Sequence, residues 1–391
     1  MIEQLQQPEI QKFINDHLDD QPAELMLRAS QYPNWPMKAI VEQIMSKRKA
    51  KSKLPDWYST ENLIYPSVLS MEQCSSQKAA EYKSSLVSGN SIVDLTGGFG
   101  VDTFYLSKRF KETVHVEMNL ALSTLVKHNY STLTSRINTI NDTAEKYLAD
   151  MDPVDLIYID PARRDASDRK VVFLEDYSPN VIELMPQLLV KGKQILIKVS
   201  PMLDIKKALA DLRFVKEVHV LALNNEVKEL LFLLEGTEDL SPKVKAVNFS
   251  NDHFETFIFD YSTEESSEPD FSEVLAYIYE PNAAIMKAGA FKSIAQRFEL
   301  KKLHVNTHLY TSDFLMSGFP GRTFKVVSEL SLNKKKLKKQ LNSEQANITT
   351  RNYPMSVKEI RTKTGLKEGG AAYVFATTDI SSKRVLLCEK V

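Results

Sequence analysis

The 391-residue sequence contains only two cysteines, Cys74 and Cys388, and they lie far apart along the chain. Two cysteines cannot build a disulfide framework, which excludes the class of small domains held together by several disulfides. No run of about 18 apolar residues occurs, so the sequence predicts no membrane-spanning helix. The first residues, MIEQLQQPEI, are polar and acidic and lack the apolar centre of a signal peptide. We therefore expect a cytoplasmic location.

Glycine is also scarce, with 12 residues in the chain, yet three of them fall within four positions at Gly97, Gly98 and Gly100. The apolar run SIVDL (91–95) precedes them, and a helical pattern starts near Val101. A strand, a glycine-rich turn and a helix together form one half of a nucleotide-binding unit. This stretch therefore predicts a nucleotide-type ligand.

The chain is too long for one ordinary domain, and its pattern of apolar residues changes along its length. Helical spacing dominates the first part, strands and helices alternate in the second, and two small mixed segments follow. We predict an N-terminal helical region (1–70), an α/β domain (71–240), a small α+β module (241–320) and a small basic domain (321–391).

Five strand candidates alternate with helices in the α/β domain, which predicts a parallel sheet with helices on both faces. They are SIVDL (91–95), TVHVE (113–117), INTI (137–140), DLIYID (155–160) and QILIKVS (194–200). Residues 214–236 have the pattern of two more strands joined near Asn224 and Asn225, a hairpin that would add one antiparallel strand. The predicted fold class is α/β, with a Rossmann-like sheet of seven strands.

The segments after residue 240 are predicted to be short strands and helices. In the small module we expect strands at 244–250 and 254–261, a polar linker at 262–270, a helix at 283–298 and short strands around 303–305 and 308–310. In the basic domain we expect strands at 324–330, 346–350, 371–378 and 384–390, with helices at 333–341 and 355–365.

Acidic residues stand at or just after the ends of the first three strands, at Asp94, Glu117 and Asp142. Three carboxylates would repel the negative charge of a diphosphate group. The glycine turn also departs from the G-x-G-x-x-G sequence of nicotinamide enzymes. Carboxylates suit a cationic ligand with hydroxyl groups, and glycines let the backbone approach it closely. S-adenosylmethionine has these features, with Glu117 placed for its ribose and Asn141 or Asp142 for its adenine. We therefore favour this methyl donor over NAD.

A fourth strand ends directly in Asp160-Pro161-Ala162-Arg163. In an open parallel sheet this turn lies in the ligand crevice, at the carboxyl ends of the strands. Arg163 is placed either to stack on a base or pair with a phosphate, or to form a salt bridge with Asp165 or Asp168.

The order of these motifs resembles class I S-adenosylmethionine-dependent methyltransferases over residues 72–236. The whole chain is similar to a Bacteroidetes methyltransferase family with a THUMP-like C-terminal domain, through LSMEQCSSQKAAEYK, YIYEPNAAIMKAGAFKSIAQRF with HLYTSD, and NYPMSVKEIRTKTGLKEGGAAYVFAT. The resemblance implies a ferredoxin-like module at 241–320 and an RNA-binding THUMP-like domain at 321–391. The residues expected to bind the donor are Asp94, Thr96, Gly97, Gly98, Gly100, Asp102, Glu117, Met118, Asn141 and Asp142.

The resemblance also assigns chemistry to the turn after the fourth strand, with Asp160, Pro161 and Arg163 as catalytic residues. In methyltransferases that modify exocyclic amines, an acid or amide before proline accepts the hydrogens of the amine, and an aromatic residue stacks on the base. Arg163 stands where that aromatic residue would be. The turn also resembles that of RNA uridine C5-methyltransferases, which need a cysteine nucleophile after the next strand. Ser200 and Pro201 occupy that place and Cys74 is expected to be a buried thiol, so transfer to nitrogen fits better.

The last 71 residues carry 15 Lys and Arg against six Asp and Glu, an excess hidden by the overall net charge of −1. The excess indicates either a polyanionic partner or a domain kept soluble by lysines. With the resemblance, it predicts RNA, either tRNA or rRNA, as the partner. The residues expected to contact RNA are Arg322, Lys334, Lys335, Lys338, Lys339, Lys363 and Lys367.

Several alternatives remain open. The substrate could be a protein or small-molecule amine, the chain could be a non-enzymatic RNA-binding protein, or, least favoured, a nicotinamide enzyme.

Phe99 and Tyr105 are expected in the core, and Gln73 is a weaker candidate for covering the donor. No metal is expected, since His304 and His308, the nearest histidine pair, would lie on one strand roughly 13 Å apart.

Overall fold

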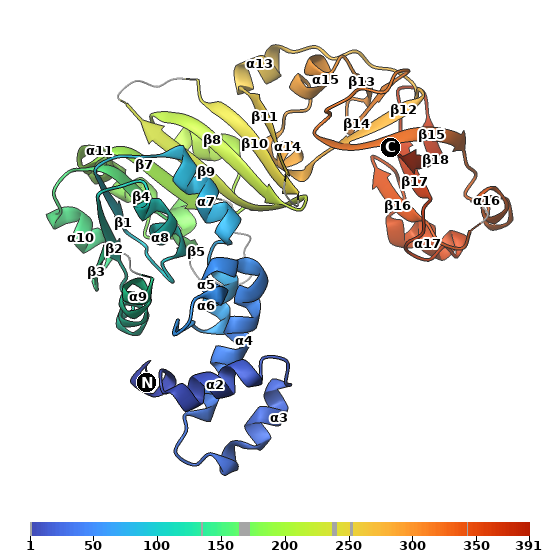
Figure 1. Ribbon diagram of the computed structural model, residues 1–391. Helices are drawn as coiled ribbons and strands as arrows, with labels where there is room; N and C mark the ends of the chain where they lie inside the picture. Colours follow the sequence, from blue (N-terminus) through green and yellow to red (C-terminus); the bar gives the residue numbers. More distant parts are fainter. Residues whose placement is uncertain (1, 134–135, 164–172, 237–240, 251–252, 342) are drawn as a thin grey trace. The chain divides into compact units, whose positions relative to one another are not determined.

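The computed structural model describes residues 2–133, 136–163, 173–236, 241–250, 253–341 and 343–391 (Figure 1). The chain forms two compact units: Met1–Val215 with Leu231–Asp239, and Lys216–Leu230 with Leu240–Val391. Within the described ranges, no helix has the length and apolar character needed to cross a lipid bilayer.

The N-terminal part of the first unit is helical, as its apolar spacing predicts. Its elements are α1 (Ile2–Leu5), α2 (Pro8–Asp16), α3 (Pro22–Leu27), the 3-10 helix η1 (Ala29–Gln31), α4 (Met37–Lys53), α5 (Pro55–Ser59), α6 (Val68–Gln73) and α7 (Gln77–Leu86). Proline opens α2, α3 and α5, where its missing N–H leaves no hydrogen bond unmade. The buried rings of Trp57 and Tyr65 lie 5.0 and 6.4 Å from that of Phe99, so this region packs directly beside the glycine turn.

A large sheet follows, with strand order β11-β10-β8-β9-β7-β4-β1-β2-β3. Its strands are β1 (Ser91–Asp94), β2 (Glu112–Val116), β3 (Ile137–Ile140), β4 (Val154–Ile159), β7 (Gly192–Val199), β8 (Val215–Leu223), β9 (Glu226–Glu235), β10 (Lys243–Ser250) and β11 (His253–Phe259). The neighbours among β7, β4, β1, β2 and β3 all pair in parallel. Their carboxyl ends therefore meet at one edge, as the sequence predicts.

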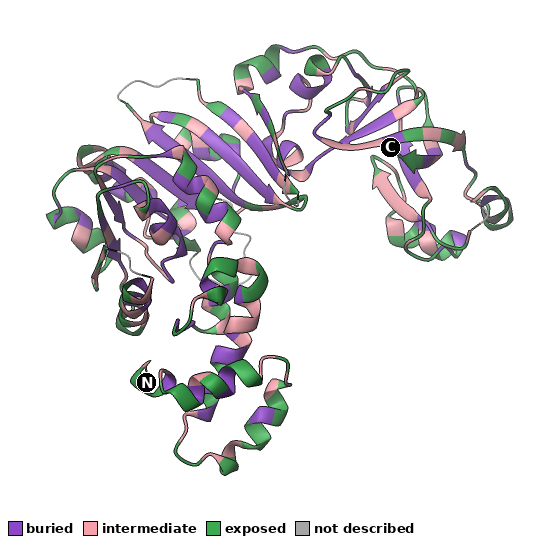
Figure 2. Ribbon diagram, in the orientation of Figure 1, coloured by how far each residue is buried: buried purple, intermediate pink, exposed green. Residues whose placement is uncertain are grey.

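Helices and short elements connect these strands: α8 (Val101–Ser107), α9 (Leu120–Thr132), α10 (Ala144–Asp150), β5 (Ala162–Arg163), η2 (Leu174–Asp176), β6 (Tyr177–Ser178), α11 (Val181–Lys191) and α12 (Ile205–Asp211). The side chains of Asn119, Thr143, Asn180 and Asp204 cap the first turns of α9 to α12. The central strands are buried along most of their length (Figure 2). Phe99 and Tyr105 are buried, as expected, in a cluster with Trp57, Tyr65 and Tyr130.

The α/β class is confirmed, but the sheet has nine strands rather than the seven expected. β10 pairs in parallel with β8 and antiparallel with β11, so both strands extend this sheet. The sequence pattern places them in the separate module at 241–320. Apolar alternation identifies a strand but not its partners, because pairing depends on residues far away in the sequence.

The second unit also contains a seven-stranded sheet of order β13-β14-β12-β15-β18-β17-β16. Its elements are α13 (Tyr261–Ser266), β12 (Tyr277–Pro281), α14 (Ala283–Ala288), α15 (Ser293–Arg297), β13 (Lys301–His304), β14 (Thr307–Ser312), β15 (Gly321–Glu329), α16 (Lys334–Leu341), β16 (Asn347–Arg351), α17 (Val357–Thr364), β17 (Tyr373–Thr378) and β18 (Lys383–Lys390). β12 pairs with β15 and β15 with β18, so one sheet crosses the predicted boundary at residue 320.

Three local expectations for this unit are wrong. The predicted linker contains α13, which Asp260 caps through the Thr263 N–H. The predicted helix at 283–298 is broken at Gly289, which has a left-handed φ of 80°. Val305 lies in the turn between β13 and β14 rather than on a strand, so the estimated separation of the two histidines does not apply.

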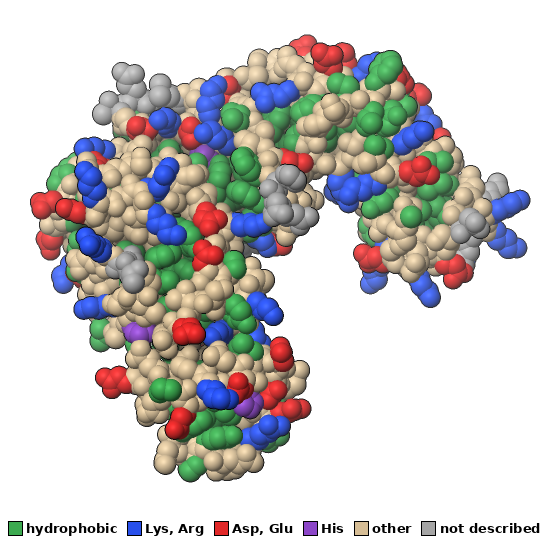
Figure 3. All heavy atoms as spheres, viewed as in Figure 1, with side chains coloured by type: hydrophobic (Ala, Val, Ile, Leu, Met, Phe, Trp, Pro, Cys, Tyr) green, Lys and Arg blue, Asp and Glu red, His purple; other side chains and the backbone are tan. Residues whose placement is uncertain are grey.

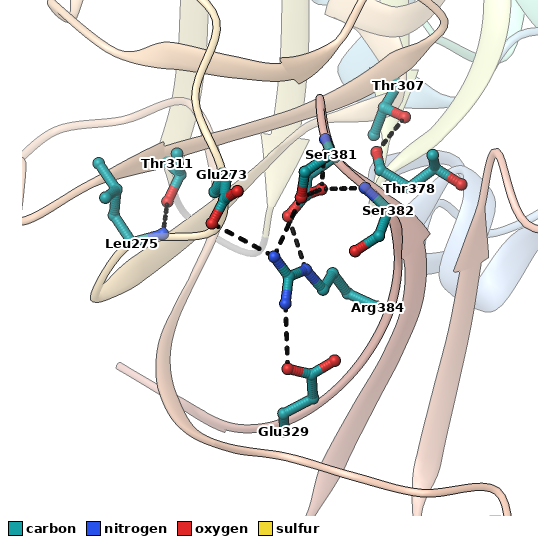
Figure 4. A network of polar contacts seen from close by, with 10 residues as sticks. Glu273, Leu275, Thr307, Thr311, Glu329, Thr378, Ser381, Ser382 and Arg384 are labelled. Atoms are coloured by element: carbon teal, nitrogen blue, oxygen red, sulfur yellow. Dashed lines mark hydrogen bonds and ion pairs between the residues drawn. The ribbon is translucent and has the colours of Figure 1, made fainter.

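Arg384 organises a polar network in the second unit (Figure 4). Its guanidinium donates to Asp379 at 2.8 Å, Glu329 at 3.2 Å and Glu273 at 3.3 Å. The Asp379 side chain is buried and also accepts the backbone N–H groups of Ser381 and Ser382. The network ties the turn before β18 to the end of β15.

Candidate active site

The glycine turn is fixed at the end of β1 by hydrogen bonds and by close packing. The Thr96 N–H donates to Asp94 Oδ1 at 3.0 Å, and the Gly97 N–H donates to the Val116 carbonyl at 2.8 Å. A Cβ at Gly97 would lie 2.1 Å from the His115 ring, so only glycine fits there. Gly98 and Gly100 have left-handed φ values of 55° and 80°.

Asp94 lies beneath this turn and is shielded from solvent. Burial raises the pKa of Asp94 to about 7, although hydrogen bonds from Thr103 and Thr96 act in the opposite direction. The negative charges of Asp102 and Asp160 add to the increase. Asp94 can therefore change its charge near neutral pH, at the point where a cationic ligand is expected.

Glu117 connects the end of β2 to the glycine turn. Its carboxylate accepts the Gly98 N–H at 2.9 Å and the Asn119 N–H at 2.7 Å. Asn141, after β3, donates its side-chain amide to the carbonyls of Glu117 and Met118 at 2.7 and 3.0 Å. The ends of the first three strands are thus joined, with the Met118 side chain 73% exposed beside them.

Asp142 makes only local contacts among the described residues. Its carboxylate accepts the Thr143 N–H at 2.9 Å and lies 3.5 Å from the Lys146 ammonium. Its predicted contact with adenine stays a prediction.

The Asp160 turn is attached directly to the glycine turn. The Asp160 N–H donates to Thr96 Oγ1 at 2.6 Å, and the Asp160 carboxylate forms an ion pair with Lys198 of β7. Burial raises the pKa of Asp160, while Lys198 acts to lower it. Pro161 is buried, and its predicted catalytic part stays a prediction.

Arg163 is exposed on β5, opposite Tyr177 of β6. Its two alternative partners, Asp165 and Asp168, lie outside the described residues. The buried Tyr177 hydroxyl forms no hydrogen bond of good geometry within the described ranges, although Ser200 lies close enough to influence its pKa. Burial is the main cause that raises the pKa of Tyr177.

A buried cluster of charges, which the sequence did not reveal, joins α7, α8 and β4. The Lys83 ammonium is 3.1 Å from Asp102 Oδ1 and 3.0 Å from Ser75 Oγ. Asp102 Oδ2 accepts hydrogen bonds from Ser75 and Tyr158 at 2.8 and 2.7 Å. Burial would raise the pKa of Asp102, but Lys83 and Lys198 hold it below its usual value. The Asp102 carboxylate is thus bound by protein groups, and its predicted contact with the donor stays a prediction.

The thiol of Cys74 lies near the same cluster, since Lys53, Asp102 and Lys198 all influence it. Burial raises the pKa of Cys74 to about 11, and its Sγ donates to the Met71 carbonyl at 3.3 Å. A thiol in this state is a poor nucleophile at neutral pH. Gln73, beside it, ends α6 with an exposed side chain.

The predicted basic residues of the C-terminal domain fall into two groups. Lys334, Lys335 and Lys339 are exposed on α16, and Lys363 and Lys367 are exposed on and just after α17. Figure 3 shows Lys and Arg side chains in this part of the chain. A Cβ at Gly365 would lie 3.3 Å from Lys334 Nζ, which places that ammonium beside the end of α17. The side chain of Lys338 is not described.

Arg322 forms the second group by itself. It lies on β15, where its guanidinium pairs with the buried Glu280 carboxylate, which Arg351 also contacts at 2.8 Å. Arg322 therefore shares one carboxylate with Arg351, and the three groups together keep a net charge of +1. The predicted RNA contact of Arg322 stays a prediction.

Comparison with known proteins places the chain in a family. Residues 277–320 match a ferredoxin-like domain and residues 321–390 a THUMP-like domain. A crystal structure of a candidate methyltransferase from Porphyromonas gingivalis W83 is 34% identical, with a TM-score of 0.87 and 98% of each chain covered.

Two other structures are similar over a smaller part. Candidate methyltransferase yhhF from Escherichia coli is 19% identical, with 41% of this chain and 85% of that chain covered and a TM-score of 0.31. TrmK from M. capricolum, in complex with S-adenosyl-homocysteine, is 12% identical, with 41% and 69% covered and a TM-score of 0.33. No protein with a curated description matches this chain. The similarity to the Porphyromonas protein extends over almost the entire length, and the chain belongs to its family, the class I S-adenosylmethionine-dependent methyltransferases with a ferredoxin-like module and a THUMP-like C-terminal domain.

Proposed function

We propose that the protein transfers the methyl group of S-adenosylmethionine to a base nitrogen of a structured RNA. The observation that carries this proposal is the hydrogen bond from the Asp160 N–H to Thr96 Oγ1. It holds the proposed acceptor site against the proposed donor site, so that a nucleophile and a methyl group can meet in a defined geometry. Alignment of this kind is the main contribution an enzyme can make to an in-line displacement.

The donor would lie over the glycine turn, with Glu117 as the partner of its ribose hydroxyls. The Glu117 carboxylate already accepts two N–H groups, which fixes its direction and keeps acceptor capacity for a ligand. Met118 offers an exposed apolar side chain next to it for an adenine ring. S-adenosylmethionine supplies an electrophilic methyl group on a positively charged sulfur, and the ionised forms of Asp94 and Asp160 would provide negative charge at this edge of the sheet.

The amine to be methylated would lie against Asp160. The carboxylate accepts one amine hydrogen and turns the nitrogen lone pair away from itself, toward the methyl group. Arg163 is exposed next to this turn and could contact a base or phosphate. The protonated state of Cys74 argues against covalent addition to a pyrimidine ring, so a nitrogen is the better acceptor.

RNA is the favoured substrate because of the basic C-terminal domain. Its exposed lysines, on α16 and around the end of α17, present positive charge to the solvent. Such groups bind phosphates and add affinity without selecting a base sequence. Recognition of the target nucleotide therefore falls to the crevice at the Asp160 turn.

A labelling experiment tests the reaction. The protein is incubated with methyl-labelled S-adenosylmethionine and total RNA from cells that lack its gene, and the labelled nucleoside is mapped. Asp160→Ala should abolish labelling, whereas Asp155→Asn, at the other end of β4, should retain it. Full labelling by the Asp160→Ala variant would show that the carboxylate has no part in transfer.

The same experiment separates the alternatives. Label in a protein or small-molecule fraction, independent of RNA, would support a different methyl acceptor. Binding of RNA without any transfer would support a non-enzymatic RNA-binding protein. A binding assay with RNA tests the lysines of α16 separately. The triple variant replaces Lys334, Lys335 and Lys339 with Ala. In a plot of log affinity against log salt concentration, its slope should be smaller by about 0.7 to 0.9 for each phosphate that the variant no longer neutralises. An unchanged slope would remove α16 from the RNA-binding surface.

A further inference from the structure

Lys198 is an unusual residue for the buried strand β7. It lies within the apolar sequence QILIKVS, and its side chain is only 10% exposed. β4 and β7 pair in parallel with Ile159 opposite Ile197. The next residues, Asp160 and Lys198, are therefore neighbours at the same edge of the sheet. Their charged ends form an ion pair through Asp160 Oδ2.

Lys198 also acts on the buried cluster around Asp102. Its positive charge, together with that of Lys83, favours the ionised form of Asp102. The two lysines and two aspartates thus form a row in which each carboxylate has a cationic neighbour. Lys83, Asp102 and Lys198 are buried in this row, whereas the Asp160 side chain is 34% exposed.

Titratable groups face the Asp160 carboxylate from several elements. They are Lys198 on β7, Asp94 on β1, Asp102 on α8, Lys83 on α7 and Tyr177 on β6, and Arg163 on β5 acts on Tyr177. The other carboxylates oppose a negative charge on Asp160, and burial opposes it as well. Lys198 is the group that forms an ion pair with Asp160 within the described ranges.

We propose that Lys198 is a positioning residue for methyl transfer, which keeps the Asp160 carboxylate negatively charged and directs its Oδ1 toward the substrate amine. The inference rests on the proposed function of this site and assigns a part in it to a residue outside the Asp-Pro-Ala-Arg turn. Because the ammonium takes Oδ2, the remaining oxygen is the one that accepts the amine hydrogen. A neutral Asp160 would place a proton where the amine needs an acceptor.

The bond changes balance without a further reactant. The amine nitrogen uses its lone pair to form the new N–C bond to the methyl carbon, the C–S bond breaks, and its electron pair goes to the sulfur. The nitrogen then carries one positive charge and loses one proton to the Asp160 carboxylate, which passes it to water. Lys198 remains protonated throughout and stabilises the carboxylate before it accepts the proton.

The chain offers a closely matched control for testing this inference. Lys193 lies on the same strand and pairs with Asp155 of β4 at 2.7 Å, but at the opposite end of both strands. Lys198→Met removes the buried cation beside Asp160, and Lys193→Met removes an exposed cation that pairs with an aspartate of the same two strands. Lys198→Gln is a second variant in case the methionine variant does not fold.

Two readouts decide the question. NMR of aspartate labelled with carbon-13 in the side chain, assigned with Asp160→Asn, should show the pKa of Asp160 rise by about one to three units in Lys198→Met. The labelling assay with the same RNA measures the rate of methyl transfer against pH. In Lys198→Met, the pH at which the rate rises should increase by a similar amount. At acid pH the rate should fall at least tenfold, and it should recover as the pH rises. Lys193→Met should match the wild type in both.

An unchanged Asp160 titration in Lys198→Met or Lys198→Gln would overturn the inference, as would a uniform loss of rate at every pH. Absence of RNA labelling by the wild type would instead contradict the proposed function. The titration needs no substrate, so in that case it still decides whether Lys198 controls the charge of Asp160.

Discussion

The ammonium of Lys83 lies 3.1 Å from Asp102 Oδ1, and the Lys83 side chain has no exposed surface. The contact joins α7, which precedes the sheet, to α8, which follows the glycine turn. The helical region before the sheet is therefore connected to the glycine turn and α8 by charge as well as by the rings of Trp57 and Phe99.

Replacement of Lys83 by Met should destabilise the protein markedly. The change leaves the buried Asp102 carboxylate without its nearest cation, which costs about 3 to 5 kcal/mol when one partner of a buried pair is removed. The free energy of unfolding, measured in urea, checks this value. Lys12→Met, which breaks an exposed pair with Asp16, serves as control and should change little. Equal effects of the two changes would contradict the importance of the buried pair.

Donor affinity should depend on the charge of Asp94. The ionised carboxylate attracts a cationic donor and the neutral form does not, so affinity should rise as pH increases through about 7 and then level off. Calorimetric titration of S-adenosylmethionine at several pH values gives the curve. The same titration with Asp94→Asn gives a curve in which residue 94 cannot change its charge. Subtracting this curve from that of the wild type removes the effect of ionisable groups on the donor itself. If affinity depended on pH in the same way in both proteins, Asp94 would stay in one charge state.

The glycine turn should be intolerant of a methyl group at residue 97. In Gly97→Ala, the new Cβ would overlap the buried ring of His115, so the turn must move and donor affinity should fall by at least tenfold. The double variant Gly97→Ala with His115→Ala removes the overlapping ring and should recover part of the affinity. Calorimetry on the two single variants and the double variant measures this coupling. Strictly additive losses would mean that the two residues do not interact as the structure shows.

The Arg384 network should contribute to the stability of the second unit. In Arg384→Met the buried Asp379 carboxylate loses its cation but keeps two backbone N–H donors, and we expect a loss of about 3 kcal/mol. Thermal and urea unfolding check the value. Lys383→Met changes the preceding, exposed residue and should have little effect.

The sequence predicted those parts of the site that depend on local patterns. The strand before Asp94, the glycine turn after it and the placing of Glu117 and Asp160 at strand ends all follow from apolar runs with polar residues at their ends. Parallel pairing then brings these ends to one edge, so the prediction needed no knowledge of side-chain packing.

The buried charges could not be predicted in this way. Lys83 lies in an ordinary helical pattern, and Ser75 and Tyr158 carry no motif. Only the fold shows that they converge on Asp102. Lys198 gave one signal that could have been followed, a lysine inside an otherwise apolar strand, since a buried lysine needs a charged partner. The extension of the sheet by β10 and β11 was missed because strand partners are set by long-range contacts.

The most direct test of the account is calorimetric titration of S-adenosyl-homocysteine, the expected product of the donor, with wild-type protein and two glutamate variants. Glu117→Ala should weaken binding by about tenfold to a hundredfold, because hydrogen bonds to a charged group contribute about 1.5 to 3 kcal/mol. Glu112→Ala, at the exposed start of the same strand, should bind as the wild type does. We expect one binding site with this ranking of affinities. No heat from the wild type, or equal binding by both variants, would show that Glu117 does not hold the donor.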